Sequence, residues 1–204
     1  MNYKNCCLDM KNLFFKLRDK RYFATKINTP FFKFDKEFPE MYPVGRDVDL
    51  IVHPEDFESI CEIVQSYCQQ QGMNYRVLHD SSTHQRHRLE SSEYFLLPNA
   101  VATDKRRNGL PLTKLHFQFD ISSVLEEEYQ GIDVSPLIEN MSMPVIRNGV
   151  KTLSNKNEAL LRCVFYAKSK SLHHRSFIYL NRDLIETRLI NDSKIWDAIN
   201  PVIS

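Results

Sequence analysis

Glycine is scarce in this chain, and its 5 glycines stand far apart in the sequence. A P-loop and a dinucleotide-binding G-x-G-x-x-G turn both need clustered glycines, because the backbone must approach phosphate closely there. The sequence therefore excludes both motifs. Any phosphate group bound by this protein must be held by metal ions and basic side chains instead.

Long apolar runs and a strong net charge are also missing. No run approaches the roughly 18–20 apolar residues of a membrane-spanning helix. The N-terminal residues mix Lys, Asp and Arg among their apolar positions, unlike a signal peptide. The net charge is +1, so no global field favours nucleic acid or an anionic membrane. We therefore expect no membrane span and no nucleic-acid partner.

Cysteine usage gives no sign of a disulfide framework or a zinc site. The 5 cysteines form no C-x-x-C pair, and their number is odd. Cys61 and Cys68 fall within an apolar helical pattern, where core packing is the simpler interpretation. This pattern is typical of reduced thiols and predicts a cytoplasmic protein.

Two aspartates open a segment that has the pattern of a buried strand. Side chains alternate faces along a strand, so Asp47 and Asp49 lie on one face while Val48, Leu50 and Val52 lie on the other. Two like charges on one face repel each other, and the neighbouring strand residues supply no cation. A divalent ion such as Mg²⁺ is the usual solution, since it prefers carboxylate oxygens. The pair therefore predicts a metal site.

A third carboxylate occurs on a later alternating segment, residues 114–121. Its apolar positions, which we expect to face a core, are Leu115, Phe117, Phe119 and Ile121. The opposite face carries His116, Gln118 and Asp120. Asp120 is therefore a candidate to join Asp47 and Asp49 if the two strands are neighbours in one sheet.

The remaining patterns predict an α+β fold with a mixed sheet, flanking helices and a helical C-terminal region. Strands are expected within residues 21–34 and at 47–53, 74–79, 83–90, 93–98 and 114–121. Helices are expected at 5–19, from Pro54 to near Gly72, and at 160–165, 177–189 and 194–199. We therefore expect a core over residues 1–149 and an all-helical region over 150–204.

This order of elements resembles the nucleotidyltransferase fold, the polymerase-beta-like superfamily. The resemblance rests on residues 47–52 (Asp-Val-Asp-Leu-Ile-Val), the helix after them, and residues 117–121 (Phe-Gln-Phe-Asp-Ile). It covers residues 20–125 and weakens in the helical tail. Residues 46–56 are similar to a narrower group of bacterial nucleotidyltransferase-like proteins, some of them found in surface-polysaccharide gene clusters.

The resemblance implies Mg²⁺-dependent transfer of a nucleotidyl group from an NTP to a hydroxyl or phosphate acceptor on a small molecule or glycan. It implies a site for two Mg²⁺ ions, in which Asp47 and Asp49 each contact both ions. It implies that Asp120 completes one metal site beside the attacking hydroxyl and is a candidate base. The side chains that it makes candidates for phosphate contact are Arg86, Arg88, Lys114 and His116.

One departure from the family leaves activity open. The family has a Gly-Ser pair at a helix start about ten residues before the D-x-D, where it binds the triphosphate. Residues 29–34 and 36–39 contain no such pair, so this phosphate contact is absent, replaced or lost. The alternatives are a catalytically degenerate binding or regulatory protein, and a metal-dependent phosphodiesterase using the same carboxylates.

Each candidate residue also has a structural interpretation. Asp47 and Asp49 could cap turns or pair with Arg46, and Asp120 could be an ordinary acid on a half-exposed strand. Residues 84–88 could contact anions or form a solvated strand face, and the basic residues 105–107 could clamp phosphate or remain a solvated loop. The adjacent residues His173 and His174 are expected to be structural.

Overall fold

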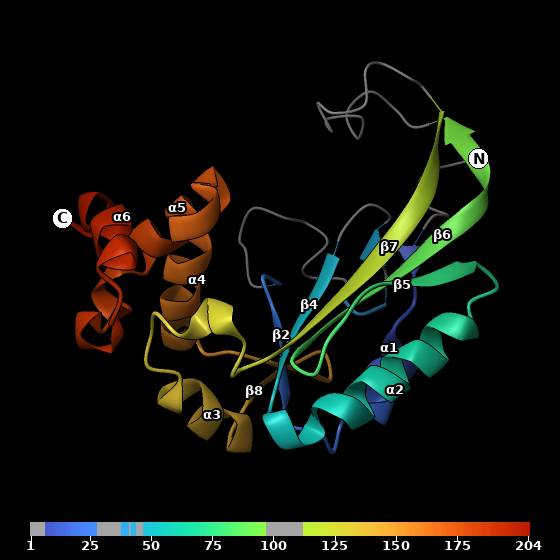
Figure 1. The fold of residues 1–204 in the computed structure, drawn as a ribbon, viewed down its shortest axis with the longest axis horizontal. Helices are drawn as coiled ribbons and strands as arrows, with labels where there is room; N and C mark the ends of the chain where they lie inside the picture. Colours follow the sequence, from blue (N-terminus) through green and yellow to red (C-terminus); the bar gives the residue numbers. More distant parts are fainter. Residues whose placement is uncertain (1–6, 28–37, 41, 44–46, 97–111) are drawn as a thin grey trace.

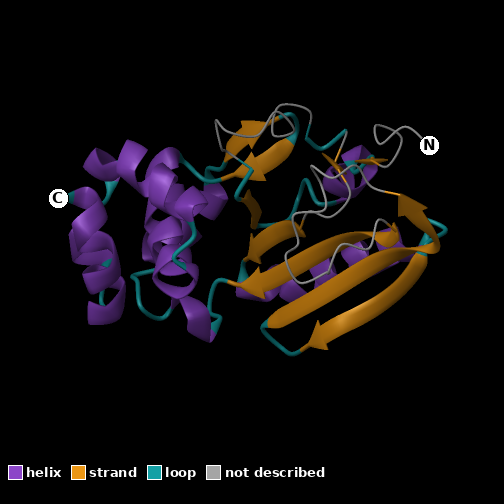
Figure 2. Cartoon of the chain, turned by 90° about the horizontal axis from the view of Figure 1, so that it is seen from above, coloured by secondary structure: helices purple, strands orange, loops and turns teal. Residues whose placement is uncertain are grey.

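The computed structural model describes residues 7–27, 38–40, 42–43, 47–96 and 112–204. For residues 7, 42–43, 93–96 and 112–115 it describes the backbone alone. Within these ranges the chain forms a mixed sheet with helices packed against it (Figure 1). The helices α1 and α2 lie under the sheet, and the last three α-helices gather on the C-terminal side (Figures 1 and 2).

A seven-stranded sheet has the order β5-β6-β7-β4-β2-β9-β8. Its strands are β2 (Tyr22–Thr25), β4 (Asp47–Val52), β5 (Asn74–Asp80), β6 (His84–Leu96), β7 (Leu112–Ser123), β8 (Val145–Arg147) and β9 (Val150–Thr152). β4 runs parallel to β7 and antiparallel to β2, while β6 pairs antiparallel with both β5 and β7. The short strands β1 (Cys7–Leu8) and β3 (Tyr42–Pro43) pair with each other outside this sheet.

The described α-helices divide into two early ones and four that follow β7. They are α1 (Lys11–Lys16), α2 (Phe57–Gln69), α3 (Ser135–Ser142), α4 (Asn155–Ser169), α5 (Leu172–Leu180) and α6 (Ser193–Ile203). Short 3-10 turns occur at η3 (Pro54–Asp56), η4 (Glu127–Tyr129), η5 (Arg182–Leu184) and η6 (Thr187–Leu189). The long helix α4 begins at a capped turn, because the Ser154 hydroxyl accepts a 3.3 Å hydrogen bond from the Asn157 amide.

The strand β4 and the helix α2 confirm the local prediction made from residues 47–72. The His53 ring accepts a 3.3 Å hydrogen bond from the Glu55 amide and so caps the first turn, where Pro54 stands at a position that needs no amide donor. After α2, Gly72 adopts φ +67, a left-handed conformation that glycine takes without steric cost. The chain therefore reverses there and enters β5.

Two apolar clusters pack on opposite faces of the sheet. Leu50 of β4 packs with Ile60 of α2 in one cluster. Ile51, the next residue, packs with Phe23 of β2 and Leu161 of α4 in the other. Since adjacent strand residues face opposite ways, the helices after β7 cover the face to which the odd-numbered residues of β4 point. Asp47 and Asp49 share that face.

The α+β class with a mixed sheet and flanking helices is confirmed. The expectation of an all-helical region from residue 150 is wrong at its start, since β9 pairs with β2 in the main sheet. β8 and β9 form a hairpin whose turn residues Asn148 and Gly149 both have positive φ. The boundary expected after residue 149 therefore falls inside this hairpin. Strands of three residues carry too little alternation to be predicted.

Helix and strand ends also differ from the expectation. The helix expected over 5–19 is shorter, and the strands expected at 83–90 and 93–98 are one strand, β6, with an irregularity between Glu90 and Tyr94. The helix expected over 177–189 ends at Leu180. There the Asn181 side chain donates a 2.8 Å hydrogen bond to the Phe177 carbonyl, and asparagine competes with the helix in this way.

Within the described part of the chain, no helix combines the length and apolar character needed to cross a membrane.

The buried face of β4 generates a stability prediction. Leu50 is 1% exposed in the core beside α2, so Leu50→Ala should lower the free energy of unfolding by about 2–5 kcal/mol. The matched control is Leu125→Ala, because Leu125 is 56% exposed and should change stability by less than about 0.5 kcal/mol. Urea unfolding followed by circular dichroism measures both. Equal effects of the two substitutions would contradict the assigned strand register.

Candidate active site

The sheet register brings two of the three predicted carboxylates directly opposite each other. In the parallel β4–β7 ladder, Asp49 pairs with Asp120 and Asp47 pairs with Gln118. Side chains directly opposite on neighbouring strands share a face, with backbones about 4.8 Å apart. Asp47, Asp49 and Asp120 therefore lie on one face, the face that also meets the helices after β7.

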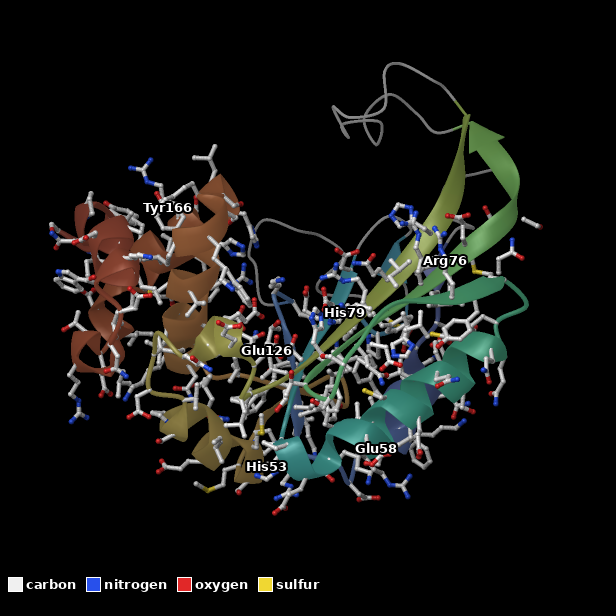
Figure 3. The ribbon with its side chains drawn as sticks, viewed as in Figure 1. His53, Glu58, Arg76, His79, Glu126 and Tyr166 are labelled. Atoms are coloured by element: carbon white, nitrogen blue, oxygen red, sulfur yellow. The ribbon has the colours of Figure 1, made fainter. Side chains whose placement is uncertain are left out.

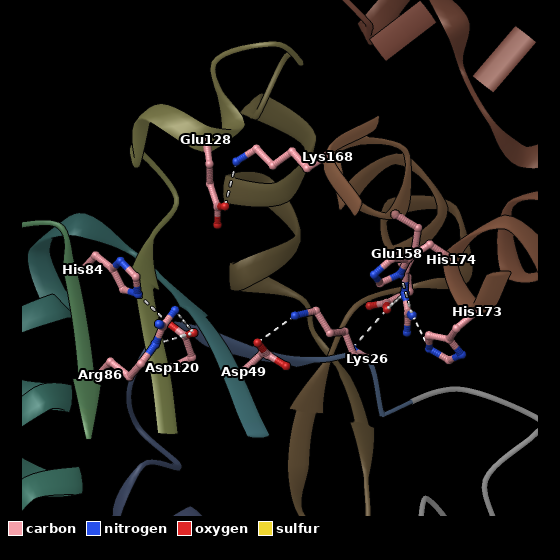
Figure 4. A network of polar contacts seen from close by, with 11 residues as sticks. Lys26, Asp49, His84, Arg86, Asp120, Glu128, Glu158, Lys168, His173 and His174 are labelled. Atoms are coloured by element: carbon pink, nitrogen blue, oxygen red, sulfur yellow. Dashed lines mark hydrogen bonds and ion pairs between the residues drawn. The ribbon is translucent and has the colours of Figure 1, made fainter. Parts of the chain in front are cut away.

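Cationic side chains neutralise this acidic row. The Lys26 ammonium lies 2.7 Å from Asp49 Oδ1 (Figure 4). The Arg86 guanidinium donates to Asp120 Oδ2 through Nη2 at 2.7 Å and Nε at 3.0 Å. His84 Nε2 lies 2.5 Å from the other Asp120 oxygen, Oδ1. Both oxygens of Asp120 thus have partners from β6, the strand next to β7.

The environment raises the pKa of Asp47 to about 6. Burial by the surrounding protein is the largest cause, the charges of Asp49 and Asp120 add to it, and those of Lys26 and Arg86 reduce it. The Asp47 side chain still reaches solvent, because protein atoms crowd the carboxylate without covering it. We therefore attribute the shift to crowding and charge repulsion together.

Asp49 has a deeper position in the same row. Its side chain is 18% exposed, and burial raises its pKa while the Lys26 charge and hydrogen bond oppose the rise. Lys26 thus supplies most of the compensation for the burial of the Asp49 charge. Because the Lys26 side chain is itself 31% exposed, it has room to move away from Asp49. Arg86 likewise pairs with Asp120, and its side chain is 38% exposed.

The side chains of the acidic row are of the ligand type that a hard divalent cation prefers. Asp47, Asp49 and Asp120 offer only carboxylate oxygens, and after burial the charges of Asp49 and Asp120 are the next causes of the raised pKa of Asp47. Among the residues whose side chains are described, no three His, Cys, Asp or Glu side chains are already gathered in a metal-binding geometry. Binding of Mg²⁺ would therefore require Lys26 and Arg86 to move away from the carboxylates.

The remaining predicted phosphate contacts lie at different distances from this row. Arg88 pairs with Gln118 in the ladder and lies 3.3 Å from Glu90 Oε2, so it is on the same face, two residues from Arg86. His116 is further along β7, opposite Glu90. Lys114 belongs to β7, but its side chain lies outside the described residues, as do the basic loop 105–107 and most of the segment expected to replace the Gly-Ser pair. These assignments stay predictions.

Sequence reasoning missed the residues that border the row on the helical side. Lys26 follows β2, and nothing in its sequence context marks it as a partner of Asp49, which is 23 residues away. Glu158 and Arg162 were also missed, although a signal existed. They stand four residues apart within the apolar pattern of α4, a spacing at which opposite charges meet on a helix. They form a buried ion pair beside His173 and His174 (Figure 4).

The side chains labelled in Figure 3 belong to several elements around the sheet. His53 and Glu58 lie at the start of α2, and Glu126 lies where the chain passes from β7 to the later helices. His79 belongs to β5, and its ring lies 4.6 Å from that of His84 between centroids, tilted by 40°. The acidic row is therefore bordered by imidazoles on one side and by the α4 helix on the other.

No protein-family model and no curated protein matches this chain.

The raised pKa of Asp47 generates a prediction about stability and pH. A carboxyl group whose pKa is higher in the folded state stabilises that state below its unfolded pKa, and this contribution is lost as pH rises through the folded value near 6. Asp47→Asn should therefore raise the melting temperature relative to the wild type at pH 8 and leave it nearly unchanged at pH 4. Thermal unfolding at both pH values measures this.

The matched control is Asp197→Asn, which changes an exposed carboxylate on α6. A stabilisation by Asp47→Asn that is the same at pH 4 and pH 8, or that the control reproduces, would contradict the repulsion assigned to the acidic row.

Proposed function

We propose that this protein is a Mg²⁺-dependent nucleotidyltransferase that moves a nucleotidyl group from an NTP to a hydroxyl or phosphate acceptor. The observation that supports this most is the row formed by Asp47, Asp49 and Asp120 on two parallel neighbouring strands. Carboxylates in this arrangement suit metal-assisted phosphoryl chemistry, and the cations beside them suit the charge of a triphosphate.

In this proposal Asp47 and Asp49 hold Mg²⁺ from β4, and Asp120 completes the site from β7. Bound Mg²⁺ supplies charge neutralisation at the phosphate oxygens and lowers the pKa of the acceptor hydroxyl. Lys26 and Arg86, released from the carboxylates, turn to the phosphate oxygens, since ammonium and guanidinium groups bind phosphate with charge-assisted hydrogen bonds.

The proposed reaction is a displacement at the α-phosphorus of the NTP and involves no change of oxidation state. The acceptor oxygen forms a bond to the α-phosphorus, the bond from that phosphorus to pyrophosphate breaks, and the hydroxyl proton passes to Asp120. His84 Nε2, 2.5 Å from Asp120 Oδ1, fixes the orientation of this carboxylate. The acceptor class remains a hydroxyl or phosphate on a small molecule or glycan, as the resemblance to the surface-polysaccharide group implies.

A second candidate function is a binding domain without turnover. It is favoured by the ion pairs themselves, since Asp49 and Asp120 already have cationic partners at 2.7 Å. In such a protein Lys26 and Arg86 would stay paired with Asp49 and Asp120, and no metal ion would bind there. The two functions differ in whether added Mg²⁺ competes with these side chains.

The proposal generates a prediction for metal and nucleotide binding. Calorimetry should detect Mg²⁺-dependent binding of the α,β-methylene analogue of at least one of ATP, GTP, CTP and UTP. Asp47→Asn combined with Asp49→Asn removes the shared ligands and should weaken this binding by more than about 100-fold, beyond the loss typical of outer-shell changes. Asp197→Asn, a carboxylate on the exposed side of α6, should bind as the wild type does.

Unchanged binding in the double variant would contradict the assigned site. Incubation with NTPs labelled at the α-phosphate separates the function classes. Label transferred to an acceptor supports the nucleotidyltransferase, release of free labelled nucleoside monophosphate indicates hydrolysis, and binding without either supports the binding domain.

A further inference from the structure

Lys26 has an unusual backbone conformation for a residue with a long side chain. It follows β2 with φ +64, in the left-handed region that non-glycine residues seldom adopt. Such a conformation persists only where surrounding contacts hold it. Here the Lys26 amide donates a 3.1 Å hydrogen bond to Glu158 Oε1 of α4. The turn that presents Lys26 to Asp49 is therefore held by a helix 132 residues further along the chain.

Glu158 is itself held by a buried network. Its side chain is 1% exposed and that of Arg162 is 0% exposed, and Arg162 Nε donates to Glu158 Oε1 at 2.7 Å. Arg162 Nη1 lies 2.6 Å from His173 Nε2 and 3.2 Å from His174 Nδ1. A guanidinium can only donate, so both imidazole nitrogens accept. The Glu158 carboxylate therefore has little freedom to leave the Lys26 amide.

The side chain of Lys26 also rests on α4. Its ammonium lies 4.5 Å from the centroid of the Phe165 ring, a cation–π distance, and 2.7 Å from Asp49 Oδ1. One helix thus contacts Lys26 at its backbone through Glu158 and at its ammonium through Phe165. Together the two contacts leave the ammonium directed at the carboxylate row.

A buried ion pair needs a reason, because well-packed apolar residues in its place are often as stable or more so. We propose that Glu158, oriented by Arg162, is a positioning residue that keeps the Lys26 ammonium beside the acidic row, where it pairs with Asp49 in the absence of metal and turns to a phosphate oxygen when Mg²⁺-nucleotide binds. This inference rests on the proposed function for the nucleotide, and on the contacts of Lys26 alone for the positioning.

Two matched variants isolate the hydrogen bond to Lys26 from the ion pair. Glu158→Leu with Arg162→Met removes both charges and the acceptor of the Lys26 amide. Glu158→Gln with Arg162→Met removes both charges but keeps an acceptor oxygen. Neither leaves an unpaired buried charge, which is the change that destabilises such sites most.

The first readout is structural and independent of any activity. The Phe165 ring current should displace the NMR resonances of the Lys26 ε-methylene protons in the wild type. We expect this displacement to persist in the Gln/Met variant and to disappear in the Leu/Met variant. Its persistence in the Leu/Met variant, or its loss in the Gln/Met variant, would overturn the positioning role. If the Leu/Met variant does not fold, the Gln/Met variant decides alone.

The second readout is the dissociation constant for Mg²⁺ with the α,β-methylene NTP analogue, measured with and without Lys26→Met. With Lys26 present, the Leu/Met change should weaken binding about tenfold, whereas in the Lys26→Met background it should weaken binding less than about twofold. Equal weakening in both backgrounds would mean that Glu158 acts only through the fold, and it would overturn the inference.

The two readouts keep this inference separate from the proposed function. If the wild type binds neither Mg²⁺ nor any of the analogues, the proposed function fails. The NMR comparison then still decides whether Glu158 positions Lys26.

Discussion

Asp49 and Asp120 face each other across the parallel ladder of β4 and β7, and this pair of like charges constrains everything built around it. Opposed carboxylates in a half-buried sheet are unfavourable unless cations compensate them. Lys26 and Arg86 provide that compensation from the strands or turns on either side. The two cations come from the strands on either side of the β7–β4 pair, so their compensation of the acidic row depends on the pairing of β2, β4, β7 and β6.

The helices after β7 share in this constraint. They cover the same face of the sheet through Ile51 and Phe23, and α4 carries the buried Glu158 that accepts the Lys26 amide. The C-terminal part of the chain is thus more than a cover for apolar surface. In our account it determines where a key cation stands, which links the conformation of α4 to the charge balance of the site.

The sequence allowed the central strands to be predicted because their signals are local. The alternation around Asp49 and around Asp120, and the capping residues before α2, each act within a few residues. The alternation also placed the aspartates on a common face once the strands were neighbours. The resemblance to a known superfamily suggested that the two strands are adjacent. The structure pairs them as β4 and β7, with Asp49 opposite Asp120.

What the sequence could not predict depends on contacts between distant segments. The three-residue strand β9 exists because β2 offers it a free edge, and no local pattern announces it. Lys26 is significant only because Asp49 and Glu158 converge on it in space. The spacing of Glu158 and Arg162 predicts an ion pair on one helix. It does not predict that the Glu158 carboxylate binds the amide of Lys26.

The central claim is that the carboxylates of β4 and β7 form a site for a hard divalent cation. Mn²⁺ takes the same oxygen ligands as Mg²⁺ and broadens the NMR signals of nearby nuclei. Titration of the protein with Mn²⁺ should broaden first the backbone signals of residues 47–49 and 119–121, and excess Mg²⁺ should reverse the effect. Broadening centred on another part of the chain, or the same pattern in Asp47→Asn with Asp49→Asn, would contradict the account.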